Sequence, residues 1–179
     1  MINWHFSQIR TWRIPAGAVA TVLSELATDG RAGNEGVVLF LGPDKNSAAV
    51  ITHLVMLRGP GIVKRPAQIR INAEIFNDVT DAALKNKVRL LGQVHSHGPQ
   101  YPLDLSPTDR ICGVKFPNYL SIVAPDYGMT AAPIRKWGVH VFSENDGYVR
   151  LSRAEAQRRI HIVQGLPYET LIVGGGYGS

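Results

Sequence analysis

Residues 90–97 read Leu-Leu-Gly-Gln-Val-His-Ser-His, an apolar run that ends in two histidines separated by one residue. The apolar run predicts a buried strand, and side chains two positions apart on a strand point to the same side. His95 and His97 can therefore aim their imidazoles at one point. Neutral imidazole is the commonest metal ligand in proteins. The pattern thus predicts a metal site at the end of a buried strand.

A third ligand follows shortly afterwards, in Ser-Pro-Thr-Asp at residues 106–109. An open zinc site takes three protein ligands and keeps one position for water. Serine is a good helix N-cap and proline is favoured at the first helical position, so a helix should begin here with Asp109 in its first turn. The proline-rich loop at 98–105 is long enough to fold that turn back over the strand. Asp104 is the alternative ligand, although no helix would position it.

The segments around this strand predict a mixed α/β domain. Helices are expected where apolar residues recur three and four positions apart, and strands where short apolar or β-branched runs are bounded by turn residues. Residues 58–70 hold two glycines, two prolines and four basic residues, and predict a surface excursion. The expected strands are 6–14, 36–41, 49–57, 88–95, 120–124, 137–142 and 148–151, and the expected helices are 15–30, 75–86 and 153–160.

The length and composition fit one domain. A chain of 179 residues can build its own core, and a hydrophobic content of 45% excludes disorder as the main state. No repeat and no second domain is evident, so we expect one domain over residues 1–165. The glycine-rich end, residues 166–179, is expected to form a flexible tail.

The sequence also indicates the compartment. Cys112 is the only cysteine, which excludes an internal disulfide and a cysteine-rich zinc module, and we expect it to face the core. No apolar run reaches the roughly 18 residues of a membrane-spanning helix, and residues 1–5 lack the start of a secretory signal. We therefore expect a cytoplasmic protein with no membrane partner. His53 is expected to be structural. His140 and His161 are not spaced from another histidine in the way that pairs of metal ligands usually are.

The charge leaves one further class of function open. The net charge is +5 with a pI of about 9.6, and the basic residues are scattered apart from short clusters at 64–65 and 158–159. Such a charge makes a nucleic-acid-binding module the alternative to an enzyme. That class of protein combines basic and aromatic side chains, and no aromatic-rich basic strand is present. We therefore expect a solvated basic surface and no nucleic-acid partner.

The histidine pair, the loop and the Ser-x-x-Asp segment together resemble the motif of the JAMM (MPN+) zinc metalloproteases. That family also carries a glutamate upstream, and Glu35 stands in that place, directly before the apolar run 36–41. The resemblance extends over residues 6–142, in which the expected helices and strands follow one another in the same order as in that family. The loop is one residue longer than usual, and Gly98 replaces the proline that often follows the second histidine. Both departures concern the path of the loop.

The resemblance implies a single JAB/MPN domain, a curved mixed β-sheet flanked by helices in a cytidine-deaminase-like architecture. It implies one catalytic Zn²⁺ held by His95, His97 and Asp109, with water as the fourth ligand. Glu35 would be the general base that takes the proton of this water and passes it to the leaving amine. Ser106 would donate to the oxyanion, a role that competes with its role as helix cap.

Members of this family mostly cut isopeptide or peptide bonds after the Gly-Gly end of a ubiquitin-like protein. Such an end is slim and extended, so it can add to a strand edge, and residues 58–70 and 98–105 are our expected walls of the groove. The compact chain resembles prokaryotic members, several of which are encoded with ubiquitin-like activating and conjugating enzymes, some in antiviral operons. The alternatives are a peptidase that acts on a sulfur-carrier protein and a non-catalytic MPN scaffold.

Overall fold

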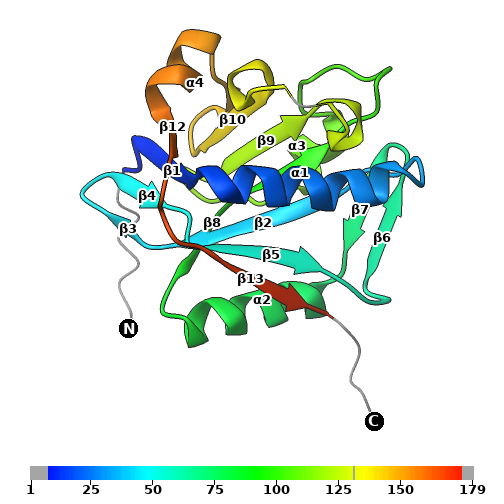
Figure 1. Cartoon of the computed structure of the whole chain (residues 1–179), viewed down its shortest axis with the longest axis horizontal. Coiled ribbons are helices and arrows are strands. Elements are labelled where there is room, and N and C mark those ends of the chain that lie inside the picture. The colour runs from blue at the N-terminus through cyan, green and yellow to red at the C-terminus, as the bar shows by residue number, and fades with distance from the viewer. Residues whose placement is uncertain (1–7, 131, 175–179) are drawn as a thin grey trace.

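The computed structural model describes residues 8–130 and 132–174, in which helices flank three β-sheets (Figure 1). The strands are β1 (Thr11–Pro15), β2 (Val37–Gly42), β3 (Asp44–Lys45), β4 (Ala48–Val50), β5 (His53–Leu57), β6 (Ile62–Arg65), β7 (Gln68–Ile71), β8 (Arg89–Ser96), β9 (Leu120–Ala124), β10 (Gly138–Ser143), β11 (Gly147–Arg150), β12 (Ile160–Val163) and β13 (Glu169–Val173). The helices are α1 (Ala16–Gly30), α2 (Ala73–Lys85), α3 (Pro107–Cys112) and α4 (Arg153–Arg159), with 3₁₀ turns at Asp126–Gly128 and Ile134–Lys136.

A seven-stranded sheet forms the centre, in the order β11-β10-β9-β8-β2-β5-β13. It is mixed, because β8 runs parallel to β9 and β5 parallel to β13, whereas β2 is antiparallel to both of its neighbours. A four-stranded sheet, β12-β1-β4-β3, and the β6–β7 hairpin complete the fold. The expected mixed α/β architecture is confirmed.

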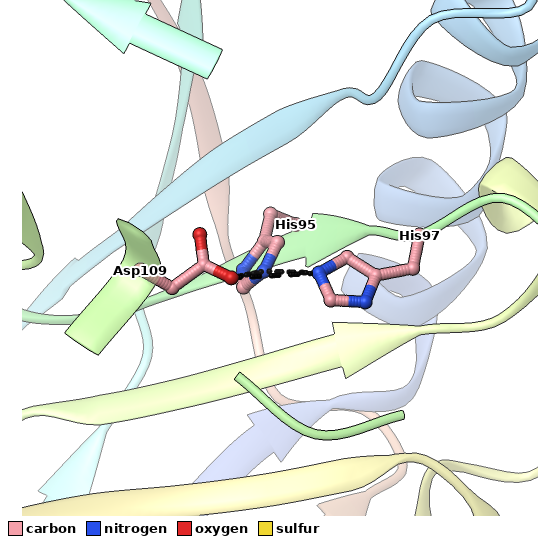
Figure 2. A group of neighbouring side chains, drawn as sticks. All are labelled: His95, His97 and Asp109. Atoms are coloured by element: carbon pink, nitrogen blue, oxygen red, sulfur yellow. Dashed lines mark hydrogen bonds and ion pairs between the residues drawn. The ribbon is translucent and has the colours of Figure 1, made fainter. Parts of the chain in front are cut away.

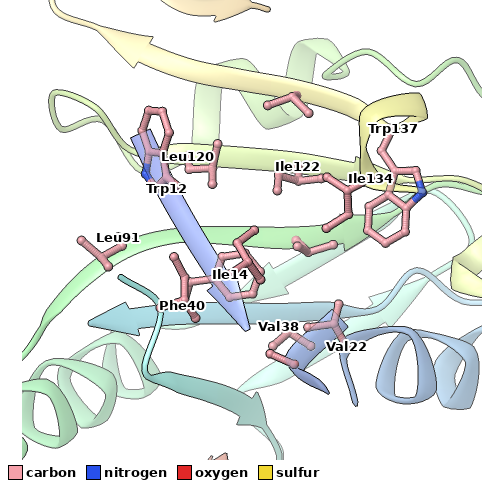
Figure 3. Close-up of a cluster of buried hydrophobic side chains, with 14 of the residues drawn as sticks. Trp12, Ile14, Val22, Val38, Phe40, Leu91, Leu120, Ile122, Ile134 and Trp137 are labelled. Carbon is pink, nitrogen blue, oxygen red and sulfur yellow. The ribbon is translucent and has the colours of Figure 1, made fainter. Parts of the chain in front are cut away.

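The central sheet is covered on both faces, and β2 shows why. All of its residues are buried, and alternate side chains of a strand point to opposite faces. Val38 and Phe40 pack with Val22 of α1 in the larger core cluster (Figure 3), whereas Leu39 packs with Val79 of α2 in a second cluster. α1 and α2 therefore lie on opposite faces of the sheet. No helix in the described part of the chain is both long and apolar enough to cross a membrane.

The segment 49–57 differs from the expectation of one strand, because the structure divides it between two sheets. β4 belongs to the small sheet and β5 to the central one. Between them, Ile51 N donates to Arg13 O of β1 at 2.9 Å, and Thr52 N donates to Leu41 O of β2 at 2.9 Å. Successive residues thus bond to different sheets, and no glycine or proline marks the crossing in the sequence.

The expected domain boundary at residue 165 is wrong. β13 pairs in parallel with β5, and Val173 is buried in the cluster beneath α2. The domain therefore includes residues 169–173, which form an edge strand of the central sheet. Residues 175–179 of the expected flexible tail lie outside the described residues, as do residues 6 and 7 of the first expected strand.

Candidate metal centre

His95 lies near the end of β8 and His97 directly follows the strand, with Ser96 between them. Ser96 points away from the two histidines, and its Oγ accepts a hydrogen bond from Gly36 N at 2.9 Å. Ser96 N also donates to Gly36 O at 3.0 Å. Ser96 thus fastens the histidine strand to the residue that follows Glu35, so these two segments lie side by side.

Asp109 lies in the first turn of α3, which begins at Pro107 with Ser106 as its N-cap, as predicted. Ser106 Oγ accepts a hydrogen bond from Asp109 N at 3.1 Å, and Asp109 Oδ2 accepts one from Ser106 N at 2.8 Å. The two bonds form a capping box, with Pro107 at the start of the helix. The box fixes the helix start and also orients the carboxylate of Asp109.

Three side-chain atoms converge at this point, as Figure 2 shows. His95 Nε2 and His97 Nε2 are 3.2 Å apart, and Asp109 Oδ2 lies 3.7 Å from the first and 3.5 Å from the second. Tetrahedral zinc with ligand bonds of about 2.0–2.2 Å holds its ligand atoms about 3.3–3.6 Å apart. The separations and the chemistry of these donors therefore fit a zinc ion.

The second ring nitrogen of each histidine also has a neighbour. His97 Nδ1 lies 2.8 Å from Pro102 O, which can only accept, so in the neutral ring Nδ1 carries the proton and Nε2 keeps its lone pair. His95 Nδ1 lies 3.5 Å from the side-chain amide of Gln93, which in turn accepts a hydrogen bond from the Tyr119 hydroxyl at 3.1 Å. The backbone carbonyl of Pro102 thus selects the tautomer of His97 that can bind a metal.

The charges in the cluster favour an ionised aspartate. Burial raises the pKa of Asp109, but hydrogen bonds with His95 and His97 outweigh burial and hold this pKa well below its usual range. Burial lowers the pKa of His97, whereas its bonds to Asp109 and Pro102 and the nearby Glu35 raise it, and the net change is upward. Asp109 is therefore negatively charged at neutral pH, as a metal ligand must be.

Glu35 lies two residues before the start of β2 and is only 5% exposed. Its backbone N–H donates to Arg65 O of the β6–β7 hairpin at 3.0 Å. Burial raises the pKa of its carboxyl to about 7, while His97 lowers it and Asp109 raises it by smaller amounts. Glu35 is thus near enough to interact with the charges of both ligands, although it is not part of the converging group described above. Its carboxyl is available to accept or donate a proton.

A groove of about 610 Å³ includes His95 and Asp109 in its lining. All of β7 lines it, together with residues of α3 and the two residues after that helix. Only the last three residues of the expected wall 58–70 line the groove, as part of β7. In the described part of the chain the loop 98–105 contributes no lining residue, and α3 takes its place. Cys112, expected to face the core, is exposed and lines this groove, because α3 buries none of its residues.

Asp104, the alternative ligand, does not join the converging atoms. Its Oδ1 instead accepts hydrogen bonds from His140 Nε2 at 2.7 Å and from Arg110 Nη2 at 2.8 Å. Burial lowers the pKa of His140, so its imidazole is neutral at neutral pH and donates its Nε2 proton to Asp104. The sequence assigned no role to His140, because its partner lies 36 residues away and only the position of β10 brings the two together.

No protein-family model and no curated protein matches the sequence. Among solved structures, the chain is similar to protein DSY2949 from Desulfitobacterium hafniense, with a TM-score of 0.65 and 14% identity over 87% of this chain and 95% of that one. A protein from Salinibacter ruber is similar with a TM-score of 0.49 and 17% identity, over 78% of this chain and 88% of that one. The likeness to protein DSY2949 shows, at this identity, that the two chains share a mixed α/β fold.

Proposed function

We propose that this chain is a zinc-dependent peptidase of the JAMM type, which cleaves the peptide or isopeptide bond after the C-terminal glycines of a ubiquitin-like protein. The observation that carries the proposal is the convergence of His95 Nε2, His97 Nε2 and Asp109 Oδ2 close to the buried carboxyl of Glu35. Structural zinc sites take four protein ligands, whereas catalytic sites take three and a water. The donor set therefore favours a catalytic site.

The residues around the metal ligands have the properties that amide hydrolysis requires. A bound zinc ion would lower the pKa of its water to about 7 and polarise the scissile carbonyl. Glu35 would accept a proton from the water and deliver it to the leaving amine, and a carboxyl with a pKa of about 7 can do both near neutral pH.

Ser106 would donate its hydroxyl proton to the oxyanion that forms on the attacked carbonyl. We expected this role to compete with helix capping, but the capping bond from Asp109 N uses a lone pair of Ser106 Oγ and not its proton. One hydroxyl can therefore cap the helix and donate to the substrate at the same time. Ser106 is accordingly part of the proposed catalytic machinery.

The groove beside β7 supports an extended substrate. β7 pairs with β6 on one edge, and within the described residues no strand pairs with its other edge. Residues of β7, and none of β6, line the groove, so the unpaired edge is available to an extended peptide by β-augmentation. Glycines before the scissile bond would let the substrate backbone approach closely between β7 and α3.

The test is a panel of ubiquitin-like proteins that carry a short C-terminal extension, with products identified by mass spectrometry. Zinc-loaded protein should release the extension by cutting after the last glycine of at least one of them, and a chelator should stop the reaction. Failure to cleave any member of the panel would contradict the substrate class. Cleavage that survives complete removal of the metal would contradict the zinc mechanism.

A further inference from the structure

The carboxylate of Asp104 joins three segments around the metal centre. Its Oδ1 accepts hydrogen bonds from His140 Nε2 of β10, from Arg110 Nη2 of α3 and from Leu105 N, at 2.7, 2.8 and 2.8 Å. The three donors come from the central sheet, from the helix that carries a metal ligand and from the loop itself. Asp104 thus connects α3 to β10, two elements that are distant in the sequence.

The loop that carries Asp104 also contacts His97. Pro102, two residues before Asp104, provides the carbonyl that accepts the proton of His97 Nδ1. Outer hydrogen bonds of this kind fix the ring orientation of metal-binding histidines. The position of the loop at residues 98–105 therefore determines where His97 Nε2 points.

A second connection reaches Asp109 through its neighbour Arg110. The guanidinium bonds Asp104 through Nη2 and the backbone carbonyl of Tyr148 on β11 through Nη1, both at 2.8 Å. α3 is short and buries none of its residues, so packing alone does little to hold it. The two bonds of Arg110 join this helix to β11 and to the loop that carries Asp104, and they help to hold it in place.

The loop lies directly on β10, which provides a fixed base. A Cβ atom at Gly138 would come within 1.9 Å of Leu103 O, so only glycine allows this approach. His140, two residues further along β10, is completely buried and cannot follow a moving loop. Its bond to Asp104 therefore anchors the loop to the sheet.

We infer that Asp104 is a positioning residue: by tying both the loop of Pro102 and the helix of Asp109 to His140, it sets the distance between two of the three metal ligands. This inference rests on the proposed metal site and adds to it a residue that does not touch the metal. Asp104 then influences the geometry and affinity of the site without binding the ion.

The test compares metal binding by the whole chain and by variants, with zinc titrations for affinity and Co²⁺ absorption in the visible range for ligand geometry. Asp104→Ala should weaken zinc binding about tenfold, in line with other outer contacts of metal ligands, and should alter the Co²⁺ spectrum. Asp104→Asn keeps an oxygen that accepts the same hydrogen bonds, so it should restore most of the affinity. Glu25→Gln, which removes the negative charge of the Glu25–Arg58 ion pair between α1 and the residue after β5, is the matched control and should change neither readout.

The outcomes separate this inference from the proposal on which it rests. Wild-type protein that binds neither zinc nor cobalt would overturn the metal site, and the inference with it. An Asp104→Ala variant with wild-type affinity and spectrum would overturn only the inference. If Asp104→Ala fails to fold, Arg110→Gln is the decisive variant, because it removes the bond between α3 and the Asp104 carboxylate. Unchanged zinc affinity in Arg110→Gln would then overturn the inference.

Discussion

Ser106 and Asp109 exchange two hydrogen bonds, and one of them holds Asp109 Oδ2, the oxygen that lies nearest to both histidines. The start of α3 and the orientation of a metal ligand therefore depend on the same pair of residues. A helix-capping motif, which commonly serves stability alone, here also presents a donor atom to the candidate metal centre.

Replacing Ser106 with alanine should separate the two roles of its hydroxyl. Ser106→Ala keeps the backbone N–H that holds Asp109 Oδ2 but loses the cap oxygen, which should lower the free energy of unfolding by about 1 kcal/mol. Loss of an oxyanion donor should also reduce kcat by about 10²–10³-fold while zinc content stays near one per chain. Ser106→Thr keeps both functions and is the control. An alanine variant with unchanged kcat would limit Ser106 to helix capping.

Glu35→Gln should keep the metal and lose turnover. The amide has the size of the carboxyl but cannot accept a proton, so loss of the general base should reduce kcat by at least about 10²-fold. Zinc content by elemental analysis and cleavage rate on the same preparation test this. A zinc-loaded Glu35→Gln protein that cleaves at the wild-type rate would exclude Glu35 as the base.

The same substitution should change how the stability of the metal-free protein depends on pH. Burial raises the pKa of Glu35 from 4.5 to about 7, so its contribution favours folding below pH 4.5 and is lost as the pH rises through about 7. Glu35→Gln lacks this titration. The free energy of unfolding of the variant minus that of the wild type should therefore increase by about 3 kcal/mol between pH 4.5 and pH 8. Urea titrations of chelator-treated protein at several pH values measure this difference, and a constant difference would contradict the buried carboxyl.

Zinc should stabilise the wild-type chain but not His97→Ala. An ion that binds the folded state alone adds about 2.7 kcal/mol to the free energy of unfolding at a concentration of 100 times its Kd. Thermal unfolding with and without zinc should therefore show a large shift for the wild type and none for His97→Ala. His161→Ala changes an exposed histidine of β12 and should behave like the wild type. Equal zinc shifts in all three proteins would place the binding elsewhere.

A change on β8 should affect the metal centre without touching a ligand. A Cβ atom at Gly92 would lie 2.3 Å from Leu120 O of β9, so Gly92→Ala must push these strands apart. We expect a loss of about 1–3 kcal/mol in unfolding free energy and weaker zinc binding, because His95 lies on the displaced strand. Gly165→Ala, at φ +69° with open space around it, should cost about 1–2 kcal/mol and leave zinc affinity unchanged. Equal zinc affinity in the two variants would contradict this coupling.

Local sequence signals predicted much of the fold and the composition of the site. Apolar runs identified β2, β8 and β9, and the spacing of His95, His97 and Asp109 selected the three side chains that converge. Contacts between distant segments were not predictable in this way. β13 needs β5 as a partner, and its short apolar run was obscured by the glycines that follow it. The pair of Asp104 and His140 depends on the position of β10, which no local pattern records.

Because β13 pairs with β5, one edge of the central sheet stays unpaired until synthesis of the chain is nearly complete. The ribosome completes β5 early, and the segments of β8, β9 and β10 are all synthesised before β13 emerges. During that interval the outer edge of β5 presents unpaired backbone groups, and such edges recruit other nascent chains into aggregates. A chain stalled just before residue 169 should therefore depend on chaperones more strongly than a chain in which residues 169–173 have emerged from the ribosome.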